Sequence, residues 1–119
     1  MSESFIELCK ILFLCHKNMS FKTVAKDNAK IHRAIYNIKK SNNNLFKDLT
    51  FDESTIYPFS DELEDMLYGL ELGEVLSTPN SEYKKYSIQN VDYLEKISDS
   101  CKFDMNKETQ QFCKELGVS

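Results

Sequence analysis

Residues 60–88, SDELEDMLYGLELGEVLSTPNSEYKKYSI, contain the pattern that decides the fold. Ser60 is a suitable N-cap for a helix, and Gly73 is placed to end that helix. The apolar residues between them recur at helical spacing and predict one buried stripe, consisting of Leu63, Met66, Leu67 and Leu70. Residues 75–77 and 83–88 then predict two short strands joined by a turn. The stretch therefore predicts a helix followed by a β-hairpin.

Helices are also predicted on both sides of this stretch. Ser4 and Glu7 have the spacing of a capping box, so we expect a helix over residues 4–17. Apolar residues cover most of its circumference, which predicts that other elements enclose it. Two shorter helices are predicted to begin near Asn90 and Met105.

The predicted elements place the chain in the mainly α (α+β) class, and its length fits one small helical domain with a β-hairpin over residues 1–119. Its apolar content is 41% and it has eight Phe residues, which is enough for one core. The apolar runs are too short for a membrane span, and acids occupy the amino end where a secretory signal carries positive charge. We therefore expect a soluble, cytoplasmic protein with no membrane partner.

The order of three helices, a glycine and a two-stranded hairpin resembles a winged helix-turn-helix domain. The resemblance rests on residues of the third helix and its turn into the wing, namely Leu63, Met66, Leu67, Leu70, Gly73, Val75 and Leu76. It implies a winged-helix-like fold in which the third helix enters the major groove of DNA and the wing contacts the backbone. This third helix is instead acidic, so a duplex would repel it.

Charge is segregated along the chain, although the formal net charge is only −4. Residues 8–47 contain nine Lys or Arg and one acid, whereas residues 48–82 contain ten acids and no Lys or Arg. Segments so opposed either attract one another within the fold or form two faces for different partners. The pattern favours a binding protein.

Basic side chains recur every three or four residues on a long helix that is predicted from a Ser20 cap to about Lys40. We call them the basic stripe, which consists of Lys22, Lys26, Lys30, Arg33 and Lys40. Lys84 and Lys85 on the predicted wing extend this positive charge. The stripe has three interpretations, which are a solvated or internally paired helix face, a contact for an acidic protein, and a contact for nucleic-acid phosphates.

The helix after Ser60 offers the opposite charge. Its predicted outer side, which we call the acidic face, consists of Glu64, Asp65, Tyr68 and Glu71. A tyrosine among carboxylates is a common anchor of protein interfaces. The acidic face is therefore a candidate docking surface for a basic partner, with a merely solvated helix as the alternative.

Catalysis is disfavoured by the motifs that the sequence lacks. Three glycines cannot build a phosphate-binding loop, and no nucleotide-binding or nucleophile-elbow motif occurs. Cys15 and His16 are adjacent, so on a helix they diverge by about 100°. His32 has no carboxylate near it in the sequence, which predicts a packing or surface residue. We predict neither an enzyme nor a bound cofactor.

The cysteine spacing argues against a metal site. Five residues separate Cys9 from Cys15 and eleven separate Cys101 from Cys113, whereas a structural zinc site usually spaces its paired ligands by about two to four residues. Apolar neighbours surround three of the four, which predicts buried free thiols.

Together these observations predict a regulatory or adaptor protein that binds another protein through oppositely charged faces. The alternative is a nucleic-acid-binding regulator that uses the helix at residues 20–40 and the wing. Complementary faces on one molecule also permit a homo-oligomer.

Overall fold

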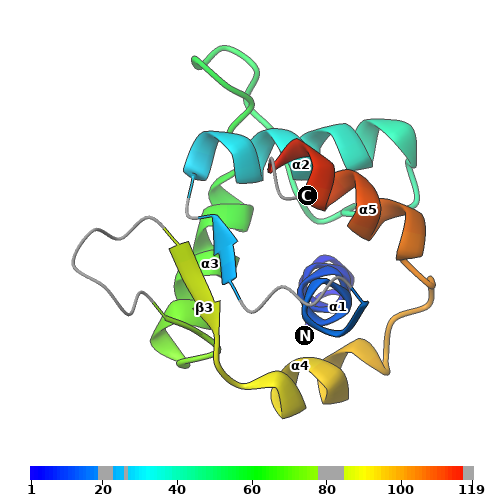
Figure 1. Ribbon diagram of the computed structural model, residues 1–119. Helices are drawn as coiled ribbons and strands as arrows, with labels where there is room; N and C mark the ends of the chain where they lie inside the picture. The colour runs from blue at the N-terminus through cyan, green and yellow to red at the C-terminus, as the bar shows by residue number, and fades with distance from the viewer. Residues whose placement is uncertain (19–22, 26, 78–84, 117–119) are drawn as a thin grey trace.

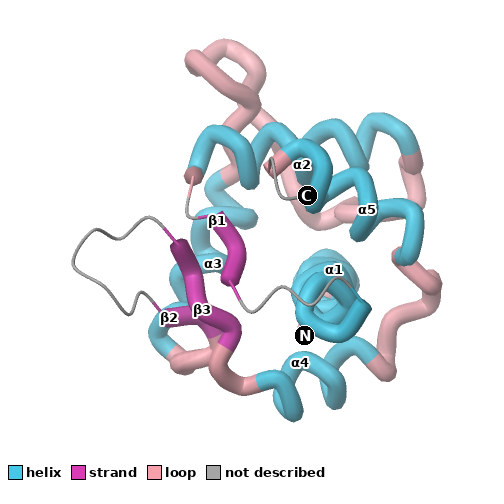
Figure 2. Tube along the Cα trace, viewed as in Figure 1, coloured by secondary structure: helices cyan, strands magenta, loops and turns pink. Residues whose placement is uncertain are grey.

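The computed structural model describes residues 1–18, 23–25, 27–77 and 85–116. These residues form five helices and one small sheet with a radius of gyration of 13.1 Å (Figures 1 and 2). In chain order the elements are α1 (Glu3–Asn18), β1 (Thr23–Ala25), α2 (Asn28–Ser41), α3 (Asp61–Leu72), β2 (Leu76–Ser77), β3 (Lys85–Ile88), α4 (Val91–Ser98) and α5 (Asn106–Glu115). The predicted class, a small mainly helical α+β domain with a β-hairpin, is confirmed. The layout is compatible with that of a winged helix.

Helix α1 is the centre of the core, as the sequence predicted. It is seen nearly end-on in Figure 1, between α4 and α5, and it packs against both of them. Its buried apolar residues are Leu8, Cys9, Ile11, Leu12, Phe13, Leu14 and Cys15. Because these residues follow one another almost without a gap, they point to all sides of the helix and every side needs a covering element.

The capping box predicted at the start of α1 is wrong. The helix begins at Glu3, and the Ser2 hydroxyl, not that of Ser4, accepts a hydrogen bond from a backbone N–H one turn later. Ser4 and Glu7 are buried instead, with exposed fractions of 0% and 4%. Their side chains bind the backbone of residues 45–49, so the polar pair is satisfied by a distant segment and not by its own helix.

The connection after α2 is held against α1 and α2 by hydrogen bonds to its backbone. Phe46 N–H donates to the Glu7 carboxylate at 2.8 Å, and Asp48 N–H donates to the Ser4 hydroxyl at 3.0 Å. The Lys39 ammonium donates to the Phe46 carbonyl at 3.0 Å. Phe46 has a left-handed φ of 54°, a conformation that a side chain disfavours, so these bonds offset a local strain.

An edge strand, β1, lies where the sequence predicted the start of a long helix. It pairs antiparallel with β3, which also pairs with β2, so the strand order is β1-β3-β2. The predicted helix from Ser20 is therefore wrong over β1, while Ser20 itself is outside the described residues. Helix α2 starts after Asp27, whose carboxylate accepts a hydrogen bond from Lys30 N–H at 3.1 Å.

The predictions for the second half of the chain are confirmed in outline. The Ser60 hydroxyl caps α3 by accepting from Leu63 N–H at 3.2 Å, and β2 and β3 form the antiparallel hairpin. The Asn90 side chain caps α4, and α5 starts at Asn106. Gly73 ends α3 with an ordinary φ of −81°, and the left-handed residue is its neighbour Glu74, with φ 60°.

Within the described part of the chain, no helix is long and apolar enough to cross a lipid bilayer.

Candidate functional site

Helix α3 presents the acidic face because its apolar stripe is turned into the core. Leu63, Leu67 and Leu70 are buried. With 3.6 residues per turn, the positions between them point away from the core, and both Asp65 and Tyr68 are exposed. Tyr68 keeps 62% of its surface in contact with solvent, which is unusual for so large a ring.

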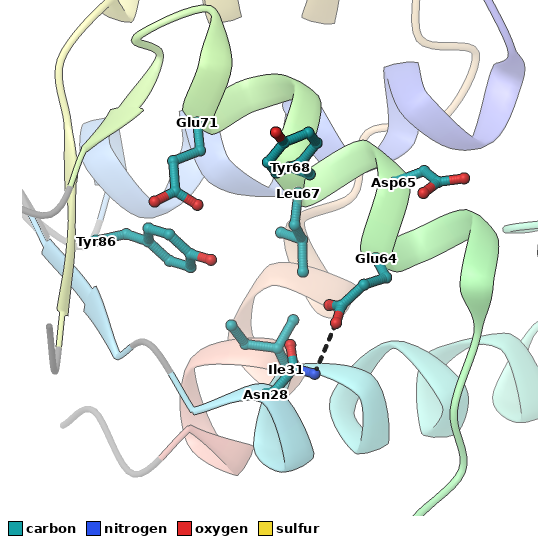
Figure 3. Close-up of a pocket in the computed structure, with 8 residues that line it drawn as sticks. All are labelled: Asn28, Ile31, Glu64, Asp65, Leu67, Tyr68, Glu71 and Tyr86. Atoms are coloured by element: carbon teal, nitrogen blue, oxygen red, sulfur yellow. Dashed lines mark hydrogen bonds between the residues drawn. The ribbon is translucent and has the colours of Figure 1, made fainter.

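All four residues of the acidic face line one cavity of about 410 Å³, shown in Figure 3. We call it the acidic cavity. Its lining residues are Glu64, Asp65, Leu67, Tyr68 and Glu71 from α3, Asn28 and Ile31 from α2, and Tyr86 from β3. The sequence predicted the residues from α3 as one side of a helix. The structure adds walls from the first turn of α2 and from the sheet.

The Glu64 carboxylate links α3 to α2 at the edge of the acidic cavity. Its Oε2 accepts a hydrogen bond from the Asn28 side-chain amide at 3.1 Å, drawn as a dashed line in Figure 3. Its Oε1 lies 3.3 Å from Nε2 of His32. The Glu64 side chain is still 43% exposed, so it can contact a ligand while it holds the two helices together.

His32 is fully buried behind Glu64, and its protonation state follows from its two partners. Ser60 N–H donates to Nδ1 at 3.1 Å, so Nδ1 carries no proton and the proton is on Nε2, facing Glu64. The ring stacks on Phe59 with centroids 4.7 Å apart. Burial lowers the pKa of His32, and the hydrogen bond to Glu64 opposes that shift only in part.

His32 is thus the packing residue that the sequence allowed, but it has a carboxylate partner that the sequence did not indicate. Glu64 is 32 residues away in the sequence, and only the packing of α2 against α3 brings the two side chains together.

The environment of Tyr86 combines burial with the negative charge of the acidic cavity. Its side chain extends from β3 into the cavity (Figure 3), and only 6% of its surface is exposed. Burial, together with the charges of Glu71 and Glu64, raises the pKa of Tyr86 to about 12. Burial is the larger cause and disfavours any charge, whereas the part of the shift that comes from Glu71 and Glu64 is of the sign that favours an ammonium or guanidinium group.

Tyr86 was not predicted to belong with the acidic face, although the sequence carries a signal for its direction. Tyr86 and Ile88 are buried and Ser87 between them is not, which is the alternation of a half-buried strand. The tyrosine therefore had to face the helices.

The basic stripe is shorter in the structure than predicted. Because α2 begins at Asn28, only Lys30, Arg33 and Lys40 stand on this helix, and all three are exposed. Lys22 and Lys26 precede the helix and lie outside the described residues. The five-turn stripe is thus corrected to three cations on one helix.

The far end of α2 combines a cation with an aromatic ring. The Lys40 ammonium lies 5.2 Å from the centroid of the Tyr36 ring, and the Tyr36 hydroxyl donates to the Glu53 carboxylate. Lys40 is therefore partly engaged within the molecule. Of the two wing lysines, Lys84 lies outside the described residues, and Lys85 is placed only by its backbone in β3.

The described cysteines are four free thiols, of which Cys9, Cys15 and Cys113 are buried. This arrangement confirms the prediction of buried thiols for those three. In the residues that the structure places, no group of three or more His, Cys, Asp or Glu side chains is arranged to hold a metal ion.

Comparison with known proteins found no match to this chain among protein-family models, curated proteins or solved structures.

Proposed function

We propose that this chain is a cytoplasmic, non-enzymatic regulatory or adaptor protein that binds a basic segment of another protein in the acidic cavity. The observation that supports this proposal is the convergence of Glu64, Asp65, Tyr68 and Glu71 on one cavity. The sequence alone predicts these four residues as a docking surface.

The chemistry of the cavity walls suits a cationic side chain on an apolar stem. Carboxylates of Glu64, Asp65 and Glu71 attract a guanidinium or ammonium group, and the rings of Tyr68 and Tyr86 offer faces for cation–π contacts. Ile31 and Leu67 supply apolar surface for the methylene stem. An arginine or lysine of the partner fits this combination of walls.

The acidic charge of α3 also supports a protein partner when the chain is compared with a winged helix. In that layout α3 would be the recognition helix, and here its first turn carries Asp61, Glu62 and Glu64 while its last turn has no basic residue. Phosphate contacts need cations or hydrogen-bond donors, so duplex DNA is a poor ligand for this helix. We propose that a winged-helix-like domain here presents its third helix to a protein.

The basic stripe is the second proposed face, for an acidic partner. Its members on α2, Lys30, Arg33 and Lys40, are exposed. The alternative function, nucleic-acid binding by α2 and the wing, uses these same cations. It is less favoured because single lysines give loose contacts and only one of the three is an arginine.

Peptides of opposite charge test the two faces separately. We would titrate the ¹⁵N-labelled protein with a short arginine–leucine peptide, a glutamate–leucine peptide and an uncharged glutamine–leucine peptide of equal length. The arginine peptide is expected to shift amide signals of α3 and β3, and the glutamate peptide those of α2. Both effects should weaken as salt is raised, because exposed charges are screened.

Two variants locate the binding in the acidic cavity. Asp65→Asn removes an exposed charge, and Tyr68→Ala removes an exposed ring. Each change is expected to lower the affinity for the arginine peptide by about tenfold. Asp92→Asn, on α4, is the matched control because it removes an equally exposed carboxylate elsewhere. Equal effects of Asp65→Asn and Asp92→Asn would contradict the proposal, since they would mean that only net charge matters.

Oligonucleotides distinguish the alternative. A duplex and a single strand that bind at low salt, shift α2 signals and dissociate steeply with added salt would favour the nucleic-acid function. Binding of oligonucleotides without binding of either charged peptide would overturn the proposed protein-binding function.

A further inference from the structure

Two of the buried thiols lie against each other. The Sγ atoms of Cys15 and Cys113 are 3.2 Å apart, although the residues are separated by 98 positions. Cys15 is in the last turn of α1 and Cys113 is near the end of α5, and these helices pack together. Both residues are almost completely buried, with exposed fractions of 1% and 2%.

We propose that Cys15 and Cys113 form a redox-sensitive pair that peroxide converts into a disulfide, which clamps α5 onto α1. A disulfide needs an Sγ–Sγ distance of about 2.05 Å, so the two sulfur atoms must approach by little more than 1 Å. This inference is independent of the acidic cavity, because neither cysteine lines it.

The contact between the two thiols makes them differ in how readily each loses its proton. Either sulfur can donate the hydrogen bond between them. With Cys15 as the donor, the contact lowers the pKa of Cys113 and raises the pKa of Cys15. Burial raises the pKa of Cys9 to about 12 and also raises that of Cys101. Cys113 is thus the thiol whose thiolate forms most readily, and thiolates are the form that reacts with peroxide.

The reaction balances with hydrogen peroxide as the oxidant. The Cys113 thiolate attacks one peroxide oxygen, the O–O bond breaks, and a sulfenic acid and one water form after the released hydroxide takes up a proton. The Cys15 sulfur then attacks the sulfenic sulfur, and the sulfenic hydroxyl leaves with the Cys15 proton as the second water. The two thiols lose two electrons, and peroxide gains them.

Local opening of α5 gives peroxide access to the buried pair. This helix is only 10 residues long, and Met105 at its N-cap has a left-handed φ of 61° and makes no side-chain capping bond. Cys113 is two residues from its last residue, Glu115. Short helix ends open far more often than the whole domain unfolds, so the Cys113 sulfur is reached without global unfolding.

The disulfide would link α1, the first helix, covalently to α5, the last described helix. It closes a loop of nearly the whole protein, which restricts the unfolded chain strongly. Helix α5 also packs on α2, so in the oxidised form all three helices would be held in their present arrangement.

Peptide mapping of the oxidised full-length protein tests the pair directly. The reduced chain would be treated with hydrogen peroxide, its remaining thiols alkylated, and its peptides identified by mass spectrometry without reduction. The expected result is one crosslink between Cys15 and Cys113, with Cys9 and Cys101 recovered as alkylated thiols. The melting temperature should rise by roughly 10 °C and return to its starting value after reduction.

Variants assign the reaction to these two residues. Cys113→Ser is expected to abolish the crosslink and the rise in melting temperature, whereas Cys101→Ser is the matched control and should retain both. Circular dichroism checks that each variant is folded before oxidation. Oxidation of Cys113 to sulfinic acid without a crosslink, a crosslink through Cys9 or Cys101, or four unreacted thiols in the wild-type chain would each overturn the proposal.

Discussion

At the scale of single residues, His32 shows how a buried side chain depends on partners that are distant in the sequence. Its Nδ1 accepts from Ser60 N–H at the start of α3, and its Nε2–H faces Glu64. A second proton would have to sit on Nδ1, where it would oppose the Ser60 N–H. Protonation of His32 therefore breaks a bond that holds the first turn of α3.

This arrangement predicts that His32 destabilises the protein in acid. Because the pKa of His32 is lowered in the folded state from its ordinary value of 6.5, the unfolded chain binds the proton more tightly. Stability from this residue is complete above pH 6.5 and is lost as the pH falls below it towards the lowered value, by at most about 1.4 kcal/mol per pH unit.

Urea unfolding between about pH 7.5 and pH 5 measures this loss. His32→Asn keeps an oxygen near the position of Nδ1 but cannot titrate, so the stability difference between wild type and variant should shrink as the pH falls. A constant difference between wild type and His32→Asn would contradict the assigned protonation state.

Single residues were predictable from the sequence where their partners are local. Ser60 caps α3 as expected because its acceptor role depends on the next three residues. Glu7 and Glu64 were assigned to a helix end and a helix surface, but their partners are Phe46 and His32. No local pattern indicates such contacts.

At the scale of secondary-structure elements, the turn after α3 is strained because its left-handed position is occupied by Glu74 and not by glycine. Glu74 has a left-handed φ of 60°, while the preceding Gly73 has φ −81°, which any residue can adopt. The left-handed conformation is about 1 kcal/mol less favourable for a residue with a Cβ, whereas glycine adopts it without this cost.

Glu74→Gly is therefore expected to stabilise the protein by about 1 kcal/mol relative to Glu74→Ala. The alanine variant is the matched control, because it also removes the carboxylate from the C-terminal end of α3 but keeps the Cβ. Free energies of unfolding from urea titration give the comparison. Equal stability of the two variants would show that residue 74 does not adopt the left-handed conformation in solution.

Long elements were predicted better than short ones. The helices α1, α3, α4 and α5 follow from apolar spacing, with the predicted side-chain caps confirmed for α3 and α4, and the hairpin follows from the turn residues between its strands. Strand β1 was missed because Thr23–Ala25 is only three residues long, too short for alternation to appear, and pairing with β3 decides its conformation. Asp27, the true cap of α2, was read only as an isolated acid within the basic segment.

The candidate site was predictable where its residues share one element and not where they come from several. The four residues of the acidic face share one helix, so helical spacing alone placed them together. Tyr86, Asn28 and Ile31 complete the cavity from β3 and α2. Their positions depend on strand register and helix packing, which the sequence does not reveal.

At the scale of the whole molecule, one continuous core predicts one cooperative unfolding transition. Ile11 on α1 is fully buried, whereas Ile56 between α2 and α3 is fully exposed. Ile11→Ala should therefore cost about 3 to 4 kcal/mol, and Ile56→Ala should change stability by less than about 0.5 kcal/mol. Urea unfolding monitored by circular dichroism and by tyrosine fluorescence gives both values.

The two probes should report the same midpoint for wild type and for each variant. Separate midpoints would show that residues 1–119 contain two independently folding units, against the expectation of a single domain.

The enclosure of α1 also has a consequence for biosynthesis. This helix leaves the ribosome well before α4 and α5, which cover much of its apolar surface. Until α4 and α5 have been translated, the nascent chain carries a helix that is hydrophobic on all sides, which must stay in water or bind a chaperone. Truncated translation products of this protein should accordingly aggregate or be degraded, because they lack the helices that complete its core.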